Sequence, residues 1–142
     1  MAYMNQEKKQ KLAPAIKAVL KKYGMKGTIG VRHNMSLVVN IKCGKLDLLG
    51  AAQKHADMVN EQRGMKYQGD VGNYLQVNEF YAAEWARKVG EEEIANFYDE
   101  LIAAMKGDGW YNNSDPMTDY FDIAYYTDIN VGKWDKGYEL AA

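Results

Sequence analysis

Residues 123–131 constrain the fold most, because their side chains alternate strictly along the chain. One face of this segment collects Ile123, Tyr125, Ile129 and Val131, with Thr127 between them. The other face collects Ala124, Tyr126, Asp128 and Asn130. A period of two residues is typical of a β-strand with one buried and one exposed face. The chain therefore contains a sheet, and the second face of that sheet is available for another purpose.

Three further segments are predicted strands. Residues 28–32 and 36–42 alternate in the same way and are separated by His33-Asn34-Met35. Asparagine accepts a left-handed turn conformation at low cost, so these two segments form a hairpin. Residues 73–78 form another strand, with Leu75 and Val77 on its buried face.

Four segments have the apolar spacing of amphipathic helices. The first ends at Gly24 and begins either near Ala13 or, with a kink at Pro14, from a turn at Asn5. The others run from Leu48 to about Arg63, from Tyr81 to Lys88, and from Glu91 to Met105. Asp47 is placed to cap the second helix and Gly64 to end it.

The element order is therefore α-β-β-α-β-α-α-β, which predicts an α+β domain of two layers. We expect a mainly antiparallel sheet of about four strands with the helices packed on one face. A chain of 142 residues with 47% hydrophobic residues is the size of one domain. We expect residues 1–142 to form that domain, with Met1 to about Asn5 frayed.

Cysteine content and hydropathy bear on the compartment. The single cysteine, Cys43, has no internal partner for a disulfide, and a structural role suits it better than a nucleophilic one. No long apolar run marks a signal peptide or a membrane span. We expect a cytoplasmic protein with no membrane contact.

The net charge of −1 conceals two oppositely charged ends. Residues 1–26 contain seven lysines and one glutamate, a net charge of +6. Residues 90–142 contain twelve acidic residues and three lysines, a net charge of −9. These charges either solvate helices and loops that attract one another within the fold, or direct one end toward a partner of opposite charge.

The outward positions of the strands form the candidate binding site. They carry Arg32, Asn40, Tyr74, Gln76, Asn78, Tyr126, Asp128 and Asn130. Tyrosine and amide side chains on a rigid sheet provide contact area and adaptable hydrogen bonds. A solvated sheet face, common in antiparallel proteins, is the alternative interpretation.

The acidic and aromatic cluster Asp119, Tyr120 and Asp122 is a second candidate. Together with Asp115 and Asp128 it supplies carboxylates for a hard cation or for acid–base catalysis. The segment lacks the glycine and the terminal glutamate of a calcium-binding loop, and nothing else points to a hydrolase. His33 and His55 have no ligating partners at metal spacing. We expect no metal, no cofactor and no catalytic residue.

Several segments resemble a family of small domains from phages and mobile elements, the large polyvalent protein-associated domains. The resemblance rests on VRHNMSLVVNI at residues 31–41, YLQVN at 74–78, SDPMTDYFD at 114–122 and YTDINVG at 126–132. It extends from about Gln6 to Tyr138, and DYFD with the downstream DINVG is its most specific part. The resemblance implies an α+β accessory module of mobile elements and assigns no catalytic residues.

These observations lead to a hypothesis and two alternatives. The leading hypothesis is a phage-encoded, non-enzymatic effector that binds a host protein in counter-defence, such as anti-restriction. An exposed sheet edge or face with tyrosines also suits pairing as a homodimer. The first alternative is a nucleic-acid-binding module that uses Lys17, Lys21 and Lys22 of the first helix. The second is a metal-dependent hydrolase that uses Asp119 and Asp122.

Overall fold

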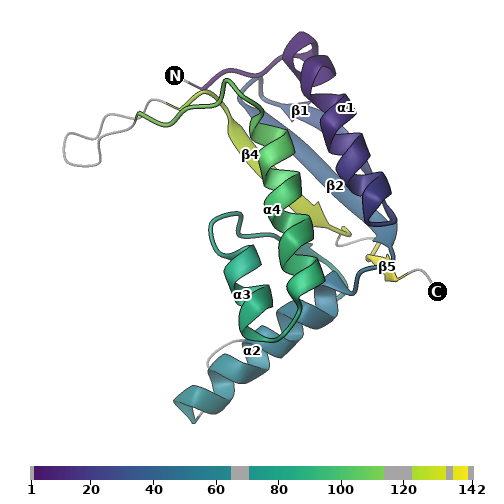
Figure 1. Ribbon diagram of the computed structural model, residues 1–142, viewed down its shortest axis with the longest axis vertical. Helices are drawn as coiled ribbons and strands as arrows, with labels where there is room; N and C mark the ends of the chain where they lie inside the picture. The colour runs from purple at the N-terminus through teal and green to yellow at the C-terminus, as the bar shows by residue number, and fades with distance from the viewer. Residues whose placement is uncertain (1, 65–70, 114–122, 134–135, 141–142) are drawn as a thin grey trace.

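The computed structural model describes residues 2–64, 71–113, 123–133 and 136–140 and has an α+β fold (Figure 1). Along the chain the elements are α1 (Gln6–Lys22), β1 (Met25–Arg32), β2 (Ser36–Gly44), α2 (Leu48–Arg63), β3 (Leu75–Gln76), α3 (Ala82–Lys88), α4 (Glu92–Lys106), β4 (Tyr126–Val131) and β5 (Glu139–Leu140). This order confirms the predicted fold class and adds β5.

The sheet is mixed, with the strand order β1-β2-β4-β3. β1 pairs with β2 and β3 pairs with β4, both antiparallel. β2 and β4 pair in parallel over Ser36–Ile41 and Tyr126–Val131, and β5 pairs in parallel with the end of β2. Two strands far apart in the sequence therefore form the centre of the sheet.

One face of the sheet is covered by helices. Figure 1 shows α1 and α4 side by side over this face, and α4 contributes the fully buried Phe97, Leu101 and Met105. Leu37, Val39, Ile41, Ile129 and Val131 of the sheet are likewise at most 1% exposed. These are the side chains that the alternation assigned to the buried face, so the core lies between the two layers.

The start of the chain is more ordered than predicted. Tyr3 donates a backbone hydrogen bond to Ala124 and Met4 donates one to Asn34, and the Met4 side chain is fully buried. Asn5 accepts a hydrogen bond from the Lys8 amide, 2.8 Å away, and so caps α1. The expected fraying therefore does not extend to Tyr3 and Met4.

The hairpin and α2 follow their local sequence patterns closely. His33 and Asn34 both have a φ of 54°, which makes the tight turn between β1 and β2. Asp47 accepts a hydrogen bond from the Gly50 amide at 2.9 Å, and Gly64 ends α2 with a φ of 68°. Both ends of α2 therefore agree with the prediction.

Two predicted strands are shorter in the structure. The strand predicted over residues 73–78 contains only Leu75–Gln76, although the Val77 amide still donates to the Ile129 carbonyl. The strand predicted from Ile123 begins at Tyr126, and Ile123 forms an isolated bridge with Asn112. The part of the last strand that remains, Tyr126–Val131, is the part that pairs with both β2 and β3.

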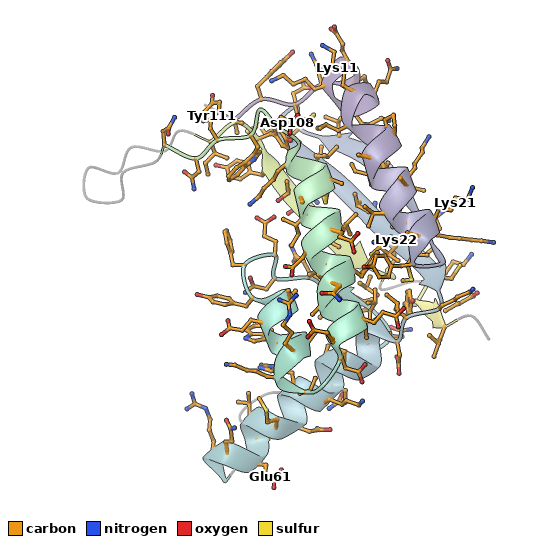
Figure 2. The ribbon with its side chains drawn as sticks, in the orientation of Figure 1. Lys11, Lys21, Lys22, Glu61, Asp108 and Tyr111 are labelled. Carbon is orange, nitrogen blue, oxygen red and sulfur yellow. The ribbon has the colours of Figure 1, made fainter. Side chains whose placement is uncertain are left out.

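The oppositely charged ends of the sequence meet between α1 and α4. The Lys22 ammonium lies 2.6 Å from the Glu100 carboxylate, and the Tyr23 hydroxyl donates to the same carboxylate. In Figure 2 Lys22 lies on the side of α1 nearer α4, whereas Lys21 extends outward. Part of the charge polarity therefore serves contacts within the fold.

Candidate binding face

The second face of the sheet, here called the open face, is the candidate site. It comprises Thr28, Gly30 and Arg32 of β1, Val38, Asn40 and Lys42 of β2, Gln76 of β3, and Tyr126, Asp128 and Asn130 of β4. These residues lie opposite the layer formed by α1 and α4 (Figure 1). The side chains of Arg32, Gln76 and Tyr126 are exposed.

An ion pair crosses the middle strand of the open face. Arg32 of β1 pairs with Asp128 of β4, and β2 runs between these two strands. Val38 of β2 stands beside Asp128 and Gly30 in the register and is only 7% exposed. The ion pair therefore spans the strand that carries this nearly buried apolar side chain.

A row of amide side chains crosses the next part of the face. Asn40, Asn130 and Gln76 are neighbours in the register of β2, β4 and β3. The Asn130 side-chain amide donates to the Asn40 side-chain oxygen at 3.0 Å. Each amide group has two donor hydrogens and a carbonyl oxygen, so this bond leaves donors and acceptors for a partner.

Two clefts meet at this amide row. One has a volume of about 140 Å³ and is lined by residues that include Asn40, Lys42, Lys133 and Lys136. The other has a volume of about 270 Å³ and is lined by residues that include Tyr74, Gln76 and Asn130. Asn40, Gly132 and Lys133 line both clefts. Asn40 of the amide row therefore lines both clefts, and Gln76 and Asn130 line the larger one. Lys42, Lys133 and Lys136, which line the smaller cleft, are here called the lysine rim.

The turn after β4 fixes the position of that rim. The backbone amides of Lys133 and Lys136 each donate to the other residue's carbonyl, at 2.8 and 3.2 Å. Gly132 precedes them with a φ of 72°, and a Cβ there would lie 2.5 Å from the Tyr138 nitrogen. Tyr138 in turn donates to the Asn73 carbonyl at 2.8 Å. Glycine is therefore required where β4, the Tyr74 segment and the lysine turn meet.

Most of the predicted binding residues come together in the structure. Arg32, Asn40, Gln76, Tyr126, Asp128 and Asn130 lie on the open face, and Tyr74 lines the larger cleft. Asn78 lies elsewhere: its side-chain oxygen accepts from the Phe80 amide and its carbonyl from the Ala82 amide, at the start of α3. Asp119, Tyr120 and Asp122 lie outside the described residues.

The lysine rim was not predicted. Lys42 is outward-facing by alternation, but Lys133 and Lys136 come after the last predicted strand. Only the parallel pairing of β2 with β4 brings them beside Lys42. The Gly132 that ends β4 was the one local indication of a tight turn at this place.

The other residues singled out in the sequence are placed as follows. His33 is exposed at the hairpin turn, and Cys43 is half-buried at the end of β2. His55 is buried in α2, and its ring stacks on that of Trp85 with 4.6 Å between centroids. Within the described ranges no three His, Cys, Asp or Glu side chains are grouped closely enough to hold a metal ion.

The carboxyl group of Glu79 lies on the covered side of the sheet. The Thr127 hydroxyl, in the middle of β4, donates to the Glu79 carboxylate. Burial raises the pKa of Glu79, and the positive charge of Lys106 opposes this only in part. This carboxyl group therefore belongs to the packing beneath the sheet and faces away from the clefts.

Comparisons with protein-family models, with curated proteins and with solved structures return no match for this chain. Among the helices of the described residues, none combines the length and the hydrophobicity needed to cross a membrane.

Proposed function

We propose that this protein is a non-enzymatic binding module that engages a partner protein through the open face. The observation that carries the proposal is the amide row Asn40–Asn130–Gln76, which lines the larger cleft and reaches the smaller one through Asn40. Amide groups there offer hydrogen bonds in both directions from a backbone that the sheet holds rigid.

The exposed tyrosines support a protein partner. Tyr74 is 51% exposed and Tyr126 is 44% exposed, on either side of the amide row. Tyrosine is enriched at the centres of protein interfaces because it provides a large contact area with few rotatable bonds. Asp128 lies between Tyr126 and the amides and is already paired with Arg32, an arrangement that suits a mixed protein surface better than a phosphate backbone.

The lysine rim defines the charge of the partner surface. Lys133 and Lys136 are exposed, and Lys42 is exposed beside them. Cations at a rim accelerate association with an acidic surface and make it sensitive to salt. The resemblance to mobile-element domains supplies the setting of the proposal: a phage effector that binds a host protein in counter-defence.

The test is affinity capture from bacterial lysate, with and without nuclease, followed by reconstitution with the purified captured protein. We compare the parent with Tyr74→Ala/Asn130→Ala on the open face and with Lys133→Ala/Lys136→Ala on the rim. Lys17→Ala/Lys21→Ala on α1 makes the same change of charge on the other side of the molecule and serves as the matched control.

We expect one captured protein that resists nuclease and binds the Tyr74→Ala/Asn130→Ala variant at least about tenfold more weakly. The rim variant should associate more slowly and lose salt dependence, while the α1 variant behaves like the parent. Recovery of nucleic acid alone, abolished by the α1 variant, would instead establish the lysine helix as the binding element. Capture of a second copy of the chain alone would make the open face a homodimer interface.

A further inference from the structure

A second, separate cavity lies on the other side of β3, between α2, α3 and α4. Its volume is about 150 Å³. Leu75, Gln76 and Val77 line this cavity, and Leu75 and Gln76 also line the larger cleft of the open face. The short strand β3 is thus the wall between two different environments.

Small side chains create the space. The two helices that face each other across the cavity contribute Ala51, Ala52 and Ala56 from α2 and Ala82 and Ala86 from α3. Protein interiors are usually close-packed, and helices this rich in alanine ordinarily approach until their backbones nearly touch. Here the methyl groups line an opening instead, and none of the described residues around it is lysine, arginine, aspartate or glutamate.

Two stacked rings, those of His55 and Trp85, line the cavity, and Tyr81 extends the stack outside it. The Trp85 ring lies between those of His55 and Tyr81, with interplanar angles of 15° and 13°. The centroid distances are 4.6 Å to His55 and 5.7 Å to Tyr81. His55 is 6% exposed and forms the inner end of the stack, whereas Tyr81 is 50% exposed at its outer end. Flat surfaces of this kind favour flat ligands.

The polar groups around the cavity are uncharged at neutral pH. Burial lowers the pKa of His55, and the charge of Lys88 lowers it further while that of Glu84 opposes the shift, so the imidazole is neutral. Gln76 and Asn78 are exposed residues of the lining and mark the mouth. A charged ligand would lose its hydration here without gaining a counter-charge.

We propose that this cavity is a binding site for a small, uncharged, planar heteroaromatic ring system of one or two rings. Its volume matches such a ligand, the alanine methyl groups and the ring stack contact its faces, and the amides at the mouth and the imidazole satisfy its few polar atoms. This cavity and the larger cleft of the open face lie on opposite sides of β3 and share Leu75 and Gln76 as lining residues.

The test uses indole as the probe and the intact chain labelled with ¹³C at the alanine methyl groups. We expect saturable shifts of the Ala51, Ala52, Ala82 and Ala86 methyl resonances, because an aromatic ring changes the shielding of nearby methyl groups. The dissociation constant should lie below about 1 mM, and benzylammonium, which is charged, should bind at least about tenfold more weakly.

Filling the cavity provides the decisive variant. Ala52→Leu should retain the parent's circular dichroism and bind indole at least about tenfold more weakly. Ala103→Leu, at an exposed position of α4, is the matched control and should bind as the parent does. If Ala52→Leu does not fold, Ala82→Leu replaces it. Absence of saturation by the parent, or equal affinity in a folded filled variant, overturns the proposal.

Discussion

At the scale of single residues, Glu79 is the clearest case of a side chain held in an unfavourable state. Its carboxyl group accepts from the buried hydroxyl of Thr127, and burial raises its pKa. The folded protein therefore binds a proton at Glu79 more tightly than the unfolded chain does. This group's contribution to stability is fully present below the unfolded pKa and is lost as the pH rises through the folded pKa.

Glu79→Gln should remove this loss of folding stability at high pH, because glutamine can accept the same hydrogen bond without carrying a charge. We expect the variant to gain free energy of unfolding relative to the parent at pH 7, and to gain less at pH 4. Urea unfolding at both pH values measures the difference. Glu61→Gln, at an exposed position of α2, is the control and should change stability equally at both. An equal effect of Glu79→Gln at pH 4 and pH 7 would contradict the assignment.

At the scale of elements, α1 keeps one unfavourable residue in its interior. Pro14 lies inside the helix, is exposed, and cannot donate a backbone hydrogen bond to the preceding turn. The helix continues through Pro14 because Ile16 and Leu20, which follow it in the chain, are buried in the core. Asn5 also caps the first turn, which precedes it. Tertiary packing and capping thus outweigh a residue that disfavours the helix.

Pro14→Ala should therefore stabilise the protein. Alanine restores the missing donor and removes the steric conflict, and we expect a gain of about 1–3 kcal/mol in the free energy of unfolding. Ala18→Gly, at another exposed position of α1, shows how far the stability of the protein depends on helix propensity in α1. It should lower the free energy of unfolding by about 1 kcal/mol. Chemical denaturation of the three proteins is the measurement. Unchanged or reduced stability of Pro14→Ala would show that the proline ring itself contributes to packing or to the geometry of α1.

The elements that could be predicted from the sequence are those set by local chemistry. Asp47 and Gly64 determine both ends of α2, and Asn34 with its positive φ determines the hairpin turn. The alternation of 126–131 correctly placed Asn130 and Asp128 on the face opposite the core. In each case the residues that decide the structure lie within a few positions of one another.

What could not be predicted depends on contacts between distant segments. The parallel pairing of β2 and β4 joins segments separated by about ninety residues, and no periodicity encodes the direction of pairing. The lysine rim, the clefts and the position of Asn78 all follow from that pairing or from the start of α3. The cavity beside β3 depends on the distance between α2 and α3. The alanines on these helices do not determine that distance.

At the scale of the whole molecule, β4 and the residue before it connect the sheet to the helical layer. β4 is paired on both sides, with β2 and β3, and the residue before it is anchored from the helical layer. The Tyr125 hydroxyl donates to the Met105 carbonyl at 2.5 Å, and the Trp110 indole donates to the Tyr125 carbonyl at 2.8 Å. By contrast, Figure 1 shows the last turns of α2 extending beyond the rest of the fold.

Native-state hydrogen exchange should reveal this difference. We expect the amides of 127–131 and 37–41 to exchange only with global unfolding, at least about a hundredfold more slowly than those of Val59–Arg63. Mass spectrometry of exchanged peptides is sufficient to separate the segments. Similar exchange in β4 and in the end of α2 would mean that the sheet opens locally and that β4 is not its central support.

The position of β4 also matters during synthesis on the ribosome. β2 is translated well before its parallel neighbour, and at about 5–20 residues per second the interval between Gly44 and Val131 is on the order of ten seconds. Throughout that interval the nascent chain leaves one edge of β2 unpaired. Asn40 and Lys42 in this strand disfavour pairing with strands of neighbouring nascent chains, so polar residues of the open face protect this edge until β4 is made.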